Sequence, residues 1–147
     1  EGIAVHGDRL YVANERMIGR LIVVDLPTLR VIDDFSVGAA GRNALDVHYS
    51  DLCFFDGSLW ALLRESRVVL RINPETHSVQ AEFDYAIMEQ APEVVYHTLY
   101  PTGTMEGLAV DRENIWLVTD NNGLSRVRYP SDIRPTLFRC RRPDGTK

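Results

Sequence analysis

The sequence predicts an all-β fold built from three copies of a four-stranded blade, and three observations lead to it. The chain repeats itself with starts about fifty residues apart, a period typical of propeller blades. Each copy holds four short segments rich in strand-forming residues, separated by turn residues. Several segments are apolar at consecutive positions, which indicates strands covered on both faces. The expected fold is a β-propeller fragment, part of a ring of the six-bladed type.

The three copies cover residues 1–35, 50–83 and 106–138 of one partial propeller domain, 1–147. Copies one and three open with nearly the same five residues, EGIAV and EGLAV. An aliphatic residue followed by an aromatic one recurs in register as Leu10-Tyr11, Leu59-Trp60 and Ile115-Trp116. A β-sandwich would have no reason to repeat these positions. We therefore expect the pairs to be buried between neighbouring blades.

The first copy shows the expected order of elements most clearly. Strands are predicted at 2–5, 9–14, 20–25 and 29–35, with turn residues such as Gly7 and Pro27 between them. The second and third strands are apolar for several residues running, so both of their faces must be covered. The other two copies are expected to repeat this order of four strands.

Two longer connectors, 36–49 and 84–105, separate the copies. The segment 86–92 has helical character, whereas 96–104, with Pro101 and Gly103, is predicted to be a loop. Insertions of this kind gather on one face of a propeller, where ligands often bind. The basic tail, 139–147, is expected to fray.

Composition narrows the class of protein. The chain has 147 residues, of which 45% are hydrophobic and 25% charged, as in one ordinary soluble domain. No apolar run approaches the roughly 18 residues that cross a bilayer. The net charge of -5 gives no field that would attract nucleic acid, so neither a membrane span nor a nucleic-acid partner is expected. A buried thiol is favoured over a disulfide for Cys53, which is far in sequence from Cys140.

Three blades leave an open arc with an apolar flank at each end, whereas propellers close with four to eight blades. Further blades of the same chain, or a second copy of this chain, would close the ring. The chain begins directly in a core strand, which favours the first of these two interpretations. Either way, the flanks are expected to bind other blades.

The copies resemble blades of the SdiA-regulated family in three places: EGIAV with LYVANER, SDLCFF with LWALLRESRVVLRINPET, and EGLAV with IWLVTDNNG. They are also similar to propellers described as having esterase-like activity of phytase. The resemblance implies a ring of about six blades, a calcium or other divalent ion near the central channel, and a periplasmic or secreted location. The second copy departs from the pattern, because Ser50-Asp51 replaces Glu-Gly.

The innermost strands start with polar residues that should meet at the channel mouth: Glu1, Ser50 or Asp51, and Glu106. Carboxylates that converge in a narrow channel need a cation, an arginine or a proton in order to coexist. Their hard oxygen atoms suit calcium. One hypothesis is therefore a Ca²⁺ site on Glu1, Asp51 and Glu106. In the other, these side chains cap backbone amides or pair with an arginine of the next blade.

A second polar set follows the second strand of each copy. It contains Glu15 and Asp120, which could hydrogen-bond a ligand or fix the local turn. Two histidines in the connectors, His48 and His97, are further candidates for ligand contact.

Two functions fit these residues. The first is a binding or scaffold propeller that holds a small molecule or a protein. The alternative is a calcium-assisted hydrolase of a phosphoester or lactone, in which calcium polarises the substrate and a carboxylate activates water. The sequence shows no nucleophile elbow and no general base with a partner that tunes it, which favours binding.

Overall fold

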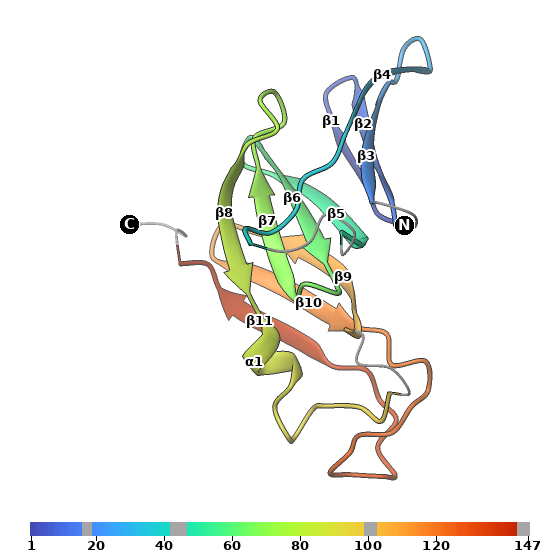
Figure 1. The fold of residues 1–147 in the computed structure, drawn as a ribbon, viewed down its shortest axis with the longest axis vertical. Helices are drawn as coiled ribbons and strands as arrows, with labels where there is room; N and C mark the ends of the chain where they lie inside the picture. Colours follow the sequence, from blue (N-terminus) through green and yellow to red (C-terminus); the bar gives the residue numbers. More distant parts are fainter. Residues whose placement is uncertain (16–18, 42–46, 99–102, 144–147) are drawn as a thin grey trace.

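The computed structural model describes residues 1–15, 19–41, 47–98 and 103–143. Apart from one short helix, α1 (Ala86–Glu89), its regular elements are strands, which form three antiparallel sheets lying side by side (Figure 1). The predicted all-β fold and the three blades are confirmed. Within the described ranges, no helix is long and apolar enough to pass through a bilayer.

The first two sheets are four-stranded blades in simple chain order. Blade 1 consists of β1 (Ile3–His6), β2 (Arg9–Asn14), β3 (Arg20–Asp25) and β4 (Arg30–Phe35). Blade 2 consists of β5 (Tyr49–Phe55), β6 (Ser58–Leu63), β7 (Val68–Ile72) and β8 (Val79–Asp84). The strands of blade 1 begin and end within one residue of the predicted bounds.

Blade 3 differs from the prediction. It contains β9 (Met105–Val110), β10 (Asn114–Thr119) and β11 (Leu137–Arg141), so this sheet has three strands within the described part of the chain. Because β11 pairs with β10, it takes the place that β3 and β7 hold in the other blades. The expectation of a third strand directly after β10 was wrong, and so was the expectation that the tail frays from 139. Pro130 and Pro135, which cannot donate to a sheet, interrupt the segment before β11.

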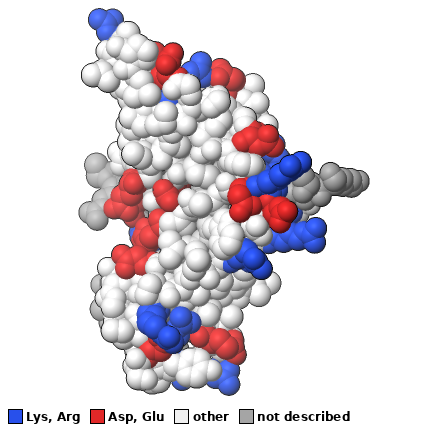
Figure 2. All heavy atoms as spheres, turned by 180° about the vertical axis from the view of Figure 1, so that it is seen from behind, with Lys and Arg blue, Asp and Glu red and all other residues white. Residues whose placement is uncertain are grey.

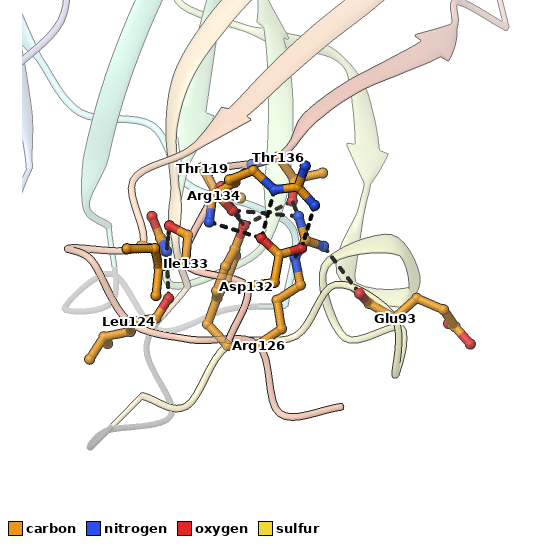
Figure 3. Close-up of polar contacts among 10 residues, drawn as sticks. Glu93, Thr119, Leu124, Arg126, Asp132, Ile133, Arg134 and Thr136 are labelled. Carbon is orange, nitrogen blue, oxygen red and sulfur yellow. Dashed lines mark hydrogen bonds and ion pairs between the residues drawn. The ribbon is translucent and has the colours of Figure 1, made fainter. Parts of the chain in front are cut away.

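The long segment between β10 and β11 is held by polar contacts within itself and with the connector before blade 3 (Figure 3). Arg126 donates from Nη1 to the carbonyl of Glu93 at 3.1 Å, and its Nε lies 3.1 Å from the Asp132 carboxylate. Asn121 donates from Nδ2 to the carbonyl of Ile133 at 2.9 Å. These contacts replace the strand ladder that the segment lacks.

Two apolar cores lie between the blades. The first joins blades 1 and 2, and the second joins blades 2 and 3. Of the repeated pairs, Tyr11, Leu59, Trp60 and Ile115 are at most 3% exposed, as predicted, whereas Leu10 and Trp116 are only half-buried. Both exceptions lie on the faces of the outer blades that no neighbouring blade covers.

Both cysteines are free thiols that pack at the edge of the second core. Burial raises the pKa of the Cys53 thiol to about 12. The free thiol favoured over a disulfide agrees with the structure, although Cys53 is half-buried and not fully buried. Its raised pKa keeps the thiol protonated at neutral pH.

Gly2 shows why an innermost strand opens with Glu-Gly. A Cβ at Gly2 would lie 2.4 Å from the backbone nitrogen of Leu52 and 2.6 Å from the carbonyl carbon of Asp51, so β1 and β5 can approach only at a glycine. We expect Gly2→Ala to lower the free energy of unfolding by about 1 to 3 kcal/mol, the usual range for overpacking. Urea unfolding followed by circular dichroism would measure it.

The matched control is Gly7→Asn. Gly7 has φ +56, a Cβ on it would meet nothing within 4 Å, and asparagine tolerates this φ. A loss for Gly2→Ala no greater than that for Gly7→Asn would contradict the close-approach explanation.

Candidate functional site

The strand register brings the two predicted polar sets to the same end of the blades. In each blade the innermost strand starts where its antiparallel neighbour ends. A polar cleft of about 500 Å³ opens there, lined by Glu1, Glu15, Ser50, Asp51, Arg64, Glu106, Asp120 and Asn122. Figure 2 shows a group of acidic side chains at mid-height along one edge of the molecule. We call this cleft the channel-mouth cleft.

All five carboxylates named from the sequence line this cleft: Glu1, Glu15, Asp51, Glu106 and Asp120. The histidines do not. His48 is half-buried beside the cleft, with Nδ1 3.8 Å from Oε1 of Glu65. The exposed His97 lies in the connector before blade 3, and its amide donates to the carbonyl of Ser125.

Arg64, at the end of β6, joins the three blades through its guanidinium. Its Nη2 donates to Oε1 of Glu15 from blade 1 at 2.7 Å, and its Nη1 donates to Oε1 of Glu106 from blade 3. Its Nε donates to Oε1 of Glu65 at 3.2 Å. Since the Arg64 side chain is 20% exposed and that of Glu15 is 9% exposed, solvent screens these pairs only in part.

Both carboxylate oxygens of Asp51 accept hydrogen bonds from backbone amides. Its Oδ2 accepts from the amide of Leu108 in β9 at 2.7 Å, and its Oδ1 accepts from the amide of Leu52 at 2.8 Å. One carboxylate thus ties the innermost strands of blades 2 and 3 together. The exposed Asp120 accepts from the amide of Asn122 at 2.9 Å, which fixes the turn after β10.

Negative charge exceeds positive charge in the cleft, because five carboxylates surround one guanidinium. The pKa of Glu106 is raised above its ordinary value of 4.5, first by burial and then by repulsion from Glu1 and Glu15, although Arg64 opposes this rise. The cleft therefore favours a cationic group over an anionic one.

Ser50 adds a polar atom that is not satisfied by the protein. The residue is 4% exposed and lines the cleft, and its Oγ is buried with no hydrogen-bond partner among the described residues. Leaving a buried hydroxyl without a partner costs about 1 to 3 kcal/mol.

Two of the carboxylates predicted to bind calcium, those of Asp51 and Glu106, have protein partners in this structure. In the described part of the chain, no group of three or more His, Cys, Asp and Glu side chains is arranged to hold a metal ion. The cation between Glu15 and Glu106 is the Arg64 guanidinium, and both Asp51 oxygens accept backbone amides. Calcium needs six to eight oxygen ligands at about 2.3 to 2.6 Å, whereas both oxygens of Asp51 and one oxygen each of Glu15 and Glu106 already accept from protein donors.

Arg64 is the charged residue of the cleft that was not predicted as a candidate, and Ser50 was named only as the alternative to Asp51. A signal for both was present in the repeat. Arg64 holds the position of Glu15 and Asp120, and Ser50 holds that of Glu1 and Glu106. Blade 2 thus has Arg64 and Ser50 at the two cleft positions where blades 1 and 3 have acidic residues. Arg64 is therefore a single cation between the acidic residues of the two neighbouring blades.

Another cavity, of about 320 Å³, lies between blades 2 and 3 and is lined in large part by apolar side chains such as Val69, Phe83, Met88 and Leu117. It is continuous with the second core. The convergence of charged side chains distinguishes the channel-mouth cleft from it as the candidate site.

Comparison with known proteins supports the fold. No known protein family matches the chain, and no curated protein does. Among solved structures, the chain is similar to the Neurospora crassa Pan2 WD40 domain, with a TM-score of 0.55 and 13% identity over 94% of this chain and 36% of that one. The chain is also similar to Saccharomyces cerevisiae Sqt1, with a TM-score of 0.52 and 12% identity over 95% of this chain and 30% of that one. For Myxococcus xanthus glutaminyl cyclase the TM-score is 0.52 and the identity 15%, over 80% of this chain and 42% of that one.

These neighbours are propeller-type folds, so the three sheets are blades of a β-propeller. The chain spans less than half the length of each of them. At such low identities the likeness defines the architecture alone.

Proposed function

We propose that this chain is part of a ligand-binding β-propeller whose channel-mouth cleft binds a small organic cation. The observation that carries the proposal is a cleft with five carboxylates around one guanidinium and a buried hydroxyl with no partner among the described residues. Ammonium groups donate several hydrogen bonds and carry the required charge.

The geometry favours an organic cation over a bare calcium ion. An ammonium group needs two or three acceptors, which Glu1, the second oxygen of Glu106 and the second oxygen of Asp120 can supply while Arg64 keeps its pairs. Calcium would need Arg64 to withdraw from Glu15 and Glu106. The alternative function, calcium-assisted hydrolysis of a phosphoester or lactone, depends on that withdrawal, so we derive no catalytic step for it.

The finer family assignment is also a proposal. The Glu-Gly openings of β1 and β9 and the repeated aliphatic-aromatic pairs support kinship with SdiA-regulated propellers and with those of the esterase-like-activity-of-phytase type. That kinship implies a periplasmic or secreted location. The close approach at Gly2 explains one motif residue physically, since a side chain there would meet β5.

Isothermal titration calorimetry with three probes tests the proposed ligand class. The probes are 1,4-diaminobutane, the neutral butane-1,4-diol of similar shape, and CaCl₂. We expect a saturable signal with the diamine and none with the diol. A calcium signal stronger than the diamine signal would overturn the proposal and support the metal site.

Variants that remove one charge inside or outside the cleft test whether the diamine binds in the cleft. Asp120→Asn and Glu106→Gln each remove one charge from the cleft and should weaken diamine binding by about threefold to tenfold, as expected for a partly screened charge pair. Asp56→Asn removes the same charge at the β5–β6 turn, the opposite end of blade 2, and should leave binding unchanged. Equal effects of all three variants would indicate non-specific attraction.

The pH dependence of binding follows from Glu106. Its pKa lies above 4.5, so this carboxylate takes up a proton earlier than an ordinary glutamate as the pH falls. Affinity for the diamine should therefore decrease from pH 7 towards pH 4.5, and Glu106→Gln should flatten that decrease. Calorimetry at four pH values would measure it, and an affinity that rises towards pH 4.5 would contradict the assignment.

A further inference from the structure

Blade 1 has an open face with a regular apolar ladder. On the side away from blade 2, the paired positions across β1, β2 and β3 carry Ile3, Val5, Leu10, Val12, Ile22 and Val24. Ile3 is 65% exposed and Val5 is 56% exposed, although both lie in a core strand. Isolated exposed apolar residues are ordinary, but an in-register ladder across three strands is not.

The equivalent positions in blade 3 are buried against the neighbouring blade 2. Leu108, Ile115 and Leu117 hold the places of Ile3, Leu10 and Val12, and they are 8%, 3% and 2% exposed. They belong to the core that encloses Trp60 of blade 2. The ladder of blade 1 is therefore the same half of a blade-to-blade interface, without its counterpart.

The missing counterpart is present at the other end of the chain. In blade 2, Trp60 is cross-strand from Arg71, whose guanidinium carbon lies 5.8 Å from the indole centroid, and this pair faces blade 3. In blade 3, Trp116 is cross-strand from Arg139 at the same 5.8 Å. The second pair faces away from blade 2, on a surface where Leu137 is 65% exposed and Val118 is 38% exposed.

We propose that the Trp116–Arg139 face of blade 3 binds the Ile3–Val24 ladder of blade 1 in a second copy of this chain. The contact would repeat the interface that blades 2 and 3 already form within one chain. Further blades of the same chain, which the sequence favours, would present the same kind of face; a second copy is the occupant whose matching face is present in the structure. Two such contacts related by a twofold axis would close a ring of six blades.

Closure would also complete the channel mouth. Each copy carries its cleft residues at the starts of its innermost strands, and a ring would direct both sets towards one axis. The two clefts would then share a single opening.

Light scattering after size-exclusion chromatography tests the pairing. The wild-type chain is expected to elute with twice the 16.7 kDa mass of one chain. Val5→Arg on the ladder and Leu137→Arg on the Trp116 face should each yield a monomer that keeps the wild-type circular dichroism, because both side chains are exposed in one chain. Ile87→Arg is the control: Ile87 is 88% exposed in α1, off both faces, and should leave the dimer intact.

Mixing the two monomeric variants gives the sharpest test. The Val5→Arg chain keeps a complete Trp116 face and the Leu137→Arg chain keeps a complete ladder, so the mixture should associate at least about tenfold more tightly than either variant alone. A wild-type monomer at every concentration, a dimer unaffected by both arginines, a series of larger oligomers, or no association on mixing would each overturn the proposal.

Discussion

Trp60→Ala is expected to lower the free energy of unfolding by about 3 to 5 kcal/mol, the range for removing a large aromatic side chain from a packed core. Trp60 is 0% exposed, stacks on Phe83 at 5.4 Å between ring centroids, and donates from Nε1 to the carbonyl of Phe55 at 3.3 Å. Arg71 and Arg142 lie over the indole at 5.8 and 5.3 Å. Denaturant unfolding would measure the loss, with the m-value, the dependence of the unfolding free energy on denaturant concentration, unchanged between the two proteins.

Trp116→Ala is the matched control, because the repeat places the same side chain at the same position with one face open. Trp116 is half-buried, and its Nε1 donates to Oδ2 of Asp111 at 2.6 Å. The loss of stability at Trp116 in the isolated chain should be clearly smaller than that at Trp60. Equal losses would mean that the covering blade contributes little to the burial of Trp60.

Arg64→Met is expected to destabilise the fold by about 2 to 4 kcal/mol, slightly below the range for breaking a fully buried pair, because water reaches part of this site. The substitution keeps most of the aliphatic stem but leaves Glu15 and Glu106 without their shared cation. The loss should be larger at pH 7 than near pH 4.5. The raised pKa of Glu106 means that its proton is retained in the folded state at acid pH, where the repulsion disappears.

Adding Glu106→Gln to Arg64→Met should restore part of the stability, because it removes one of the charges left unpaired. Thermal melts of the single and double variants at both pH values would show this. A double variant less stable than Arg64→Met alone at pH 7 would contradict the view that Arg64 neutralises these carboxylates.

Most of the fold could be predicted from the sequence, since the repeat states the blade pattern three times. The strands of blade 1 follow from the turn residues between short apolar segments, and the burial of Trp60 follows from the aliphatic-aromatic pair that each copy repeats. The third strand of blade 3 was not predicted correctly. The strand that pairs with β10 is β11, which comes after a segment interrupted by Pro130 and Pro135. Local propensity cannot state which later strand pairs with β10.

The site could be predicted in part. That Glu1, Asp51 and Glu106 lie at one end of the blades follows from the equivalence of their strands, and the cleft contains all three. The role of Arg64 depends on side-chain reach across two blade boundaries, which strand periodicity does not encode. His97 was named as a histidine of a connector, but that connector places it outside the cleft.

Amide chemical-shift mapping with 1,4-diaminobutane tests the central claim, that the cleft at the channel mouth is a cation-binding site, most directly. We expect the amides of Ser50, Asp51, Arg64 and Glu106 to shift with one saturable curve, while those of Asp56 and Gly57 at the other end of blade 2 stay in place. Shifts spread evenly over acidic residues at both ends, or no shift at Ser50 and Glu106, would contradict it.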